Sequence, residues 1–274
     1  MRFDEKIRSL IRAKNSLVCV GLDTVPEKIP ESVRGAARIF EFNRAIINAT
    51  KDAALAFKPN LAFYEALGTE GWDILKRTVA AMPDDTLKIG DAKRGDIGST
   101  AEQYAKALFS LGFDAVTVNP YMGWDAVGPF VSDEEKGAFI LCLSSNASAK
   151  DFQYLSSGGK RLYQWVAESA VKWNARGNCG LVVGATKPDE LKELRAIAED
   201  LCFLIPGFGV QGGDLVAAVL GGTDKKGEMA IINASRSILY ASSGPDYAEA
   251  AGRQAVEMRD RINAARKKKV GSKQ

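Results

Sequence analysis

Eight short apolar runs recur along the 274 residues of this chain, each followed by a turn and a longer segment with helical spacing. The runs cover residues 16–22, 53–58, 86–93, 114–119, 137–143, 180–185, 201–206 and 229–234. Near-continuous apolar strands that alternate with amphipathic helices indicate a parallel sheet buried on both faces. The count of eight favours an α/β fold of the closed (β/α)8 TIM barrel type, and periodicity alone leaves an open doubly wound sheet as the alternative.

The segments between the runs space their apolar residues as helices do. These segments are 36–52, 65–82, 99–112, 159–177, 188–200 and 246–268, and a further helix is expected at the N-terminus over 3–14. No change of composition and no Pro- or Ser-rich linker divides the chain. We therefore expect a single barrel domain over residues 1–274, with a basic, solvated tail at 266–274.

Two connections that follow strands are long and contain several Gly and Ser residues, namely 146–160 and 212–228. In a parallel barrel the loops after the strands lie at the end where active sites are built. Both segments are therefore expected to act as lids, and 212–228 is the one expected to close on a ligand.

The chain contains no histidine, which excludes Ser-His-Asp and Cys-His nucleophilic chemistry and the usual zinc sites. Any catalysis must use Asp, Glu, Lys, Tyr, Cys or backbone groups. The four cysteines, Cys19, Cys142, Cys179 and Cys202, are far apart and form no C-x-x-C pair. Buried thiols are favoured over a metal site or disulfides for a chain of this size and type.

The net charge is only +3, so no nucleic-acid partner is implied. No apolar run approaches the roughly 20 residues of a membrane span. The N-terminal residues also lack the apolar core and the cleavage site of a signal peptide. These features predict a cytoplasmic protein with no membrane partner.

The third apolar run ends in an unusual cluster of charges, in the sequence LKIGDAKRGDIGST at 87–100. Strand alternation directs Asp91 and Lys93 to the same face, and Asp96 adds a second carboxylate beyond a turn at Gly95. A buried charge needs a partner, and Lys58 at the end of the neighbouring strand is the expected counter-charge for the two carboxylates. The sequence thus predicts an alternating Lys/Asp array, with a solvated surface cluster as the alternative.

The other strand ends are also polar, and the last two resemble a phosphate site. Residues 205–214 hold four glycines around Gln211, and residues 232–238 hold Ser235 and Arg236. Barrels often bind phosphate with the loops after the seventh and eighth strands. A phosphorylated small molecule that reaches from there to the Lys/Asp array is therefore favoured over a plain glycine turn.

These residues carry a resemblance to a known family. The strings DAKRGDIGST at 91–100, FKPNLAFYE at 57–65, LSSNAS at 143–148, PGFGVQGGD at 206–214 and NASRSI at 233–238 are similar to those of orotidine 5′-monophosphate decarboxylase, in its larger bacterial/archaeal-type subgroup. The resemblance extends from Leu17 to about Tyr240. It implies decarboxylation of orotidine 5′-phosphate (OMP) to UMP, in pyrimidine biosynthesis, without a cofactor or metal.

The resemblance also assigns roles to the charged residues. Lys93 would protonate C6 of the pyrimidine, flanked by Asp91, and Lys58 would complete the array and touch the ribose. The family is a homodimer with its active sites at the subunit interface, so Asp96, with Thr100 behind it, would reach into the partner's site.

Further substrate contacts follow from the same resemblance. The residues implied are Asp23 and Asn60 at the ribose, Ser145 and Ser144 at the pyrimidine, and Gln211 and Arg236 at the 5′-phosphate, with Ser235 beside them. A developing carbanion at C6 needs nearby positive charge and then a proton, and an ammonium group at position 93 supplies both.

Two other functions stay open on the sequence. Related 3-keto-6-phosphogulonate decarboxylases and hexulose-phosphate synthases share the D-x-K-x-x-D pattern, but they hold magnesium with an acidic pair, where this chain has Lys58. A nucleotide-binding barrel without catalytic activity is the alternative from a different class, and the intact Lys/Asp array argues against it.

Overall fold

The computed structural model describes residues 1–33, 38–207 and 214–271. Eight parallel strands close into a barrel in the order β1-β10-β9-β8-β5-β4-β3-β2. The strands are β1 Val18–Gly21, β2 Ala54–Lys58, β3 Leu87–Arg94, β4 Ala115–Val118, β5 Gly137–Leu143, β8 Cys179–Val183, β9 Cys202–Ile205 and β10 Ala230–Ala234. Each of the eight apolar runs overlaps one strand, so the predicted (β/α)8 barrel is confirmed and the open sheet is wrong.

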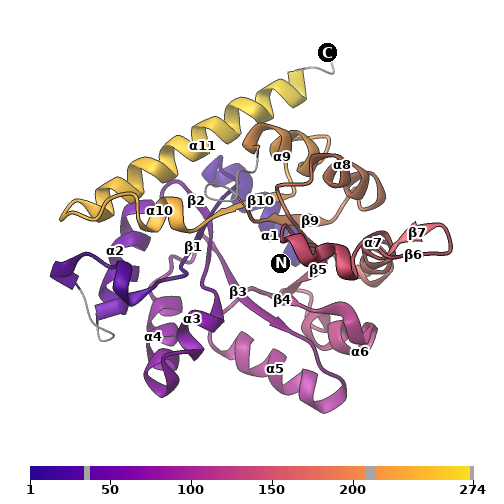
Figure 1. Ribbon diagram of the computed structural model, residues 1–274, viewed down its shortest axis with the longest axis horizontal. Coiled ribbons are helices and arrows are strands. Elements are labelled where there is room, and N and C mark those ends of the chain that lie inside the picture. The colour runs from indigo at the N-terminus through magenta and orange to yellow at the C-terminus, as the bar shows by residue number, and fades with distance from the viewer. Residues whose placement is uncertain (34–37, 208–213, 272–274) are drawn as a thin grey trace.

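Helices surround the strands on all sides, as Figure 1 shows. The described helices are α1 Phe3–Lys14, α2 Ile39–Thr50, α3 Leu61–Glu65, α4 Gly68–Ala80, α5 Gly98–Ser110, α6 Trp124–Val127, α7 Leu162–Trp173, α8 Pro188–Ile197, α9 Leu215–Gly222, α10 Arg236–Leu239 and α11 Tyr247–Gly271. Every residue of β1, β2, β4, β9 and β10 is buried between the helix layer and the barrel interior. This double burial explains why the strands are continuously apolar in the sequence.

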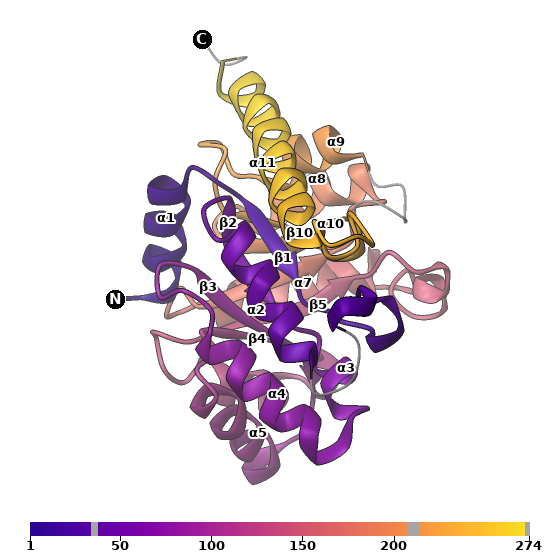
Figure 2. The ribbon, with the colours of Figure 1, turned by 90° about the vertical axis from the view of Figure 1, so that its left-hand side faces the viewer.

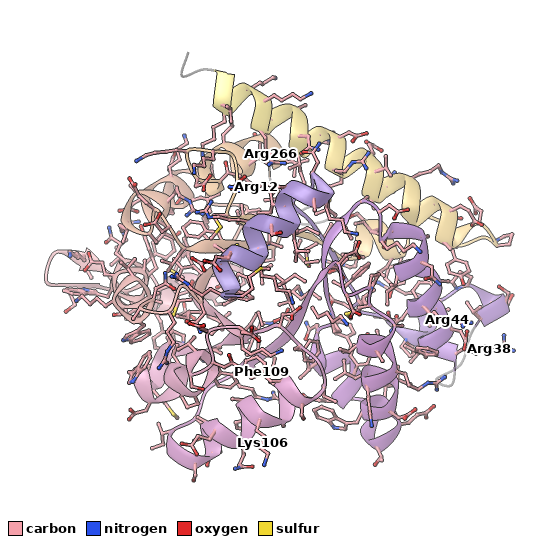
Figure 3. All side chains as sticks on the ribbon, turned by 180° about the vertical axis from the view of Figure 1, so that it is seen from behind. Arg12, Arg38, Arg44, Lys106, Phe109 and Arg266 are labelled. Carbon is pink, nitrogen blue, oxygen red and sulfur yellow. The ribbon has the colours of Figure 1, made fainter. Side chains whose placement is uncertain are left out.

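The N-terminal helix α1 has the predicted bounds and covers the end of the barrel where the strands begin. Figure 2 shows it at one end of the barrel, and Figure 3 shows it from behind, crossing in front of the strands. Phe3, Ile7 and Ile11 are buried beneath the helix, and the Phe3 ring packs edge-on against Phe139 of β5. The opposite end, where the strands finish, is left for the site.

The C-terminal segment differs from the expected solvated tail, because α11 continues to Gly271. The Lys269 ammonium donates to the carbonyl oxygens of Leu220 and Thr223, at 2.8 and 2.5 Å, at the end of α9. The Arg266 guanidinium donates to the Gly227 carbonyl at 2.7 Å. Arg266 and Lys269 of the expected tail therefore have partners within the fold. Figure 3 labels Arg266 and Arg12, which approach the same turn from α11 and α1.

The two expected lids have different outcomes. Within 212–228, residues 215–222 form α9, whose buried face packs against α8 and α11, so the expectation of a closing loop is wrong for this part. Apolar residues at Leu215, Ala218 and Val219 supply the burial that a mobile loop would lack. The segment 146–160 instead remains at the strand ends and carries a short 3₁₀ helix, Ala147–Asp151, and part of a hairpin of β6 Ser156–Ser157 and β7 Lys160–Arg161.

The four cysteines are buried and free, as predicted. Burial raises the pKa of the Cys19 thiol to about 12. None of the helices over 1–33, 38–207 and 214–271 is long and apolar enough to cross a membrane.

Candidate active site

A cavity of about 260 Å³ lies inside the barrel at the carboxyl ends of the strands. Strand alternation explains its lining, since each strand turns every second side chain inward. Residues from all eight strands or the turns after them contribute, namely Asp23, Lys58, Asp91, Lys93, Thr117, Leu141, Ser145, Val182, Leu204, Pro206, Gly207, Asn233, Ser235 and Arg236. Seven of these are among the residues predicted from the sequence, and these seven converge as expected.

The centre of the site is an ion-pair chain of Lys58, Asp91 and Lys93. One carboxylate oxygen of Asp91 lies 2.8 Å from the Lys58 Nζ, and the other lies 2.6 Å from the Lys93 Nζ. The Lys58 and Asp91 side chains are only 4% and 12% exposed, whereas that of Lys93 is 50% exposed. The prediction that Asp91 binds both lysines is therefore confirmed, but Lys93 is not enclosed by this chain alone.

The surroundings of Lys58 and Asp91 keep both of these groups charged in the neutral range. Burial alone would raise the pKa of Asp91, but Lys58 and Lys93 outweigh that effect and hold it well below its ordinary value. Burial alone would lower the pKa of Lys58, but Asp91 and Asp23 raise it above its ordinary value. The Asp91 carboxylate is therefore ionised and forms ion pairs with two ammonium groups.

The backbone of β3 is irregular where it carries these charges. Gly90 pairs with Val116 of β4, but the next pair joins Arg94 with Val118, so β3 has two extra residues in a bulge. Lys93 lies within the bulge with a φ of 49°, in the left-handed region that is uncommon for residues other than glycine. The bulge turns the end of the strand toward the cavity.

Asp96 and Thr100 do not line this cavity. Asp96 accepts a hydrogen bond from the Ile97 amide at 2.8 Å, and Thr100 is exposed on α5. Among the described residues no ion pair joins Asp96 to Lys58 or Lys93. Within one molecule, the expected array of four charges is therefore reduced to the three ion-paired charges of Lys58, Asp91 and Lys93.

The polar residues at the other strand ends divide into two groups. Asn60 caps α3 by accepting from the Ala62 amide at 3.2 Å and does not line the cavity. Ser144 also does not line the cavity. Its amide donates to the Gln153 side chain, and its hydroxyl donates to the Asn146 and Gln153 side chains. Ser145 does line the cavity.

The expected phosphate residues are partly described. Ser235 and Arg236 line the cavity at the end of β10, and the Arg236 side chain is exposed. Gln211 lies outside the described residues, so its predicted contact is untested. Pro206 and Gly207, which follow β9, complete this edge of the cavity.

Two buried oxygen atoms in the cavity wall have no hydrogen-bond partner among the residues that the structure describes. They are the Oδ1 atoms of Asp23 and Asn233. Buried polar atoms are normally satisfied, so two acceptors without partners in one cavity indicate a ligand that brings hydrogen-bond donors. Gly21 makes room for this wall, since a Cβ there would lie 1.9 Å from the Ser235 Oγ.

Sequence reasoning missed Thr117 and Asn233, which lie inside otherwise apolar strands. Both residues could have been identified by strand alternation, because each is a polar residue at a position that faces the barrel interior. Thr is common in strands for reasons of shape alone, which hides that signal at position 117.

Comparisons with known proteins agree on one family. The model of the Orotidine 5′-phosphate decarboxylase / HUMPS family matches residues 16–251. The curated Orotidine 5′-phosphate decarboxylase of Dehalococcoides mccartyi is 50% identical over 98% of this chain and 100% of its own length, and that of Ralstonia pickettii is 47% identical over 97% and 100%. The solved structure of Leishmania donovani OMP decarboxylase matches with a TM-score of 0.85 and 41% identity, over 97% of this chain and 99% of that one.

Proposed function

The chain belongs to the Orotidine 5′-phosphate decarboxylase / HUMPS family, and on that premise we propose that it decarboxylates orotidine 5′-phosphate to UMP in pyrimidine biosynthesis. The family name covers more than one activity, but the curated relatives at about half identity carry the decarboxylase name. The observation that carries the proposal is the Lys58–Asp91–Lys93 ion-pair chain in the cavity wall, in which Lys58 and Asp91 are buried and Lys93 is half exposed.

Lys93 is the proposed proton donor. When the bond between C6 and the carboxylate breaks, carbon dioxide leaves and the electron pair stays on C6. An ammonium group beside that carbon stabilises the developing charge and then transfers its proton to it, which gives UMP and a neutral lysine that solvent reprotonates. Asp91 holds the Lys93 ammonium in place at 2.6 Å, which supports this role.

The rest of the cavity supports a nucleotide that lies across the strand ends. The unsatisfied oxygens of Asp23 and Asn233 are suited to accept from ribose hydroxyl groups. Arg236 lies at the end of β10, where the guanidinium can pair with the 5′-phosphate, and we propose Gln211 and Ser235 beside it. Ser145 is the proposed pyrimidine contact. The Asn60 side chain instead accepts from the Ala62 amide, and the Ser144 amide and hydroxyl donate to the side chains of Gln153 and Asn146.

We also propose a homodimer in which Asp96 and Thr100 complete the partner's site. Large apolar side chains remain exposed next to these residues, with Ile97 at 54% and Trp124 at 46%. A groove of about 910 Å³ lies between α5 and α6 in the same region. Exposed apolar surface of this kind is typical of a protein interface, and a second copy there would cover Lys93, which one chain leaves half exposed.

The magnesium-dependent alternative is disfavoured by the charge at position 58. The Lys58 ammonium lies 2.8 Å from Asp91, so a cation already occupies the place beside that carboxylate. A divalent ion there would repel both lysines.

The test is the absorbance change when the purified chain meets OMP, with and without EDTA. We expect metal-independent turnover, and a Lys93→Ala variant should lose at least about 10³-fold in kcat because it loses the proton donor. Lys172→Ala, on the exposed surface of α7 and away from both the cavity and the groove, is the matched control and should retain full activity. Loss of turnover in EDTA, or equal rates for wild type and Lys93→Ala, would contradict the proposal.

A further inference from the structure

Thr117 of β4 makes two hydrogen bonds that join the catalytic carboxylate to the backbone of the proposed proton donor. Its hydroxyl donates to the Asp91 Oδ1 at 3.0 Å and accepts from the Lys93 amide at 2.9 Å. The same Asp91 oxygen receives the Lys93 ammonium at 2.6 Å. Three residues therefore form a closed ring of contacts around one carboxylate oxygen.

The position of Thr117 in the sheet explains why it is needed there. It lies between Val116 and Val118, the two β4 residues that pair with either side of the β3 bulge. A bulge removes regular ladder bonds, so the Lys93 amide has no strand partner across it and uses the Thr117 hydroxyl instead. Without that acceptor a partly buried amide would lack a partner, which costs free energy.

The bulge also carries backbone strain that the hydroxyl helps to hold. The φ of 49° at Lys93 is disfavoured for a residue with a side chain, and strained residues persist when their surroundings fix them. Thr117 is 1% exposed and has a stiff β-branched side chain, so its hydroxyl has a fixed direction. It is thus a rigid support beneath a strained and half-exposed lysine.

We propose that Thr117 is a positioning residue for the decarboxylation, which fixes the Asp91 carboxylate and the Lys93 backbone so that the ammonium meets C6. This inference rests on the proposed function. It assigns to Thr117 an effect on the chemical step and not on nucleotide binding, because its hydrogen bonds go to Asp91 and Lys93 and not to the ribose or phosphate end of the cavity.

The test compares Thr117→Val, which keeps the shape and removes the hydroxyl, with Thr117→Ser, which keeps the hydroxyl. We expect Val to lower kcat by about 10- to 100-fold, since small misplacement of reacting groups has effects of that size. UMP affinity should change less than about twofold, and Ser should restore most of kcat. Thr50→Val is the matched control, because it removes a buried hydroxyl that bonds Ile46 in α2, far from the cavity, and should leave kcat unchanged.

Several results would overturn the inference. A kcat within about twofold of wild type for Thr117→Val would do so, as would a parallel loss of kcat and UMP affinity that Ser does not rescue. Should Thr117→Val not fold, the pair Thr117→Ala and Thr117→Ser decides in its place. Absence of wild-type turnover would instead contradict the proposed function. A crystal structure of Thr117→Val would then test the inference by itself. Unchanged conformations of Asp91 and Lys93 would overturn the inference, and altered conformations would support it.

Discussion

At the scale of single residues, the site depends on one carboxylate that serves several groups at once. Asp91 pairs with Lys58 and Lys93 and accepts from Thr117. Since each of these contacts fixes a different neighbour, the loss of the carboxylate would release all three. Burial makes that loss costly, because Lys58 is only 4% exposed and would keep its charge without its closest partner.

The stability of the protein should therefore depend on pH through Asp91. Its pKa is lowered in the fold from an ordinary 3.8, so its stabilising effect is full above that pH and is lost as the pH falls toward the folded value. We expect Asp91→Asn to lower the free energy of unfolding by about 3 kcal/mol at pH 7, and this difference should shrink below about pH 4. Urea unfolding at several pH values measures it.

The control for this experiment is Asp189→Asn, whose carboxylate is 93% exposed and lies 3.8 Å from Lys192. An exposed pair of this kind contributes little, so the variant should match wild type at every pH. A difference between wild type and Asp91→Asn that stays constant from pH 7 to pH 3 would contradict the expectation.

Residue-scale prediction from sequence succeeded where charge was concentrated. Asp91, Lys93 and Lys58 could be found because charged residues at the ends of apolar strands are costly to bury and need a reason. Thr117 could not, because the β3 bulge that gives it a role depends on how two strands pair. Asp96 was expected in the array, yet it does not line this chain's cavity and accepts from the Ile97 amide instead.

At the scale of elements, the last turns of α11 stabilise the end of α9. The final carbonyl groups of a helix lack partners within it, and a cation nearby satisfies them and interacts well with the helix dipole. Lys269 does this for Leu220 and Thr223, and its ammonium also lies 3.0 Å from the Thr223 hydroxyl. The sequence could not show this, because a run of lysines looks solvated until the helix brings it to a neighbour.

Lys269→Met should therefore reduce stability without changing catalysis. We expect a fall of about 1.5–3 kcal/mol in the free energy of unfolding, the range for hydrogen bonds to a charged group. Lys267→Met, at an exposed position on the same helix, is the control and should change it by less than about 0.5 kcal/mol. Chemical denaturation and steady-state kinetics test both halves, and equal stability of the two variants would count against the role of Lys269.

At the scale of the whole molecule, the proposed dimer accounts for features that one chain leaves at the edge of its cavity. Lys93 is half exposed, and Asp96 lies outside the cavity beside exposed apolar residues. The barrel itself could be predicted from eight apolar runs, but the surface proposed for the dimer could not, since exposure of Ile97 or Trp124 follows only from the folded shape. The dimer was predicted from the family resemblance, and the exposed apolar surface around Ile97 and Trp124 supports that prediction.

Mixing two inactive variants tests the shared site. In a mixed dimer of Lys93→Ala and Asp96→Ala chains, one site carries both substitutions and the other carries none. Random exchange of subunits should therefore restore about a quarter of wild-type activity, because half of the dimers are mixed and each has one intact site. If Asp96 acts within its own chain, every site keeps one defect and the mixture stays inactive; sedimentation measures the dimer itself.

The helix α1 has a further consequence for turnover. Its buried residues Phe3, Ile7 and Ile11 close the barrel where the strands begin, so in the described parts of the chain the cavity is approached from the carboxyl ends of the strands. Incoming nucleotide, departing carbon dioxide and departing product would then use the same opening. The next substrate can bind only after the product has left through that opening, so product release is a natural limit on the turnover rate of such a barrel.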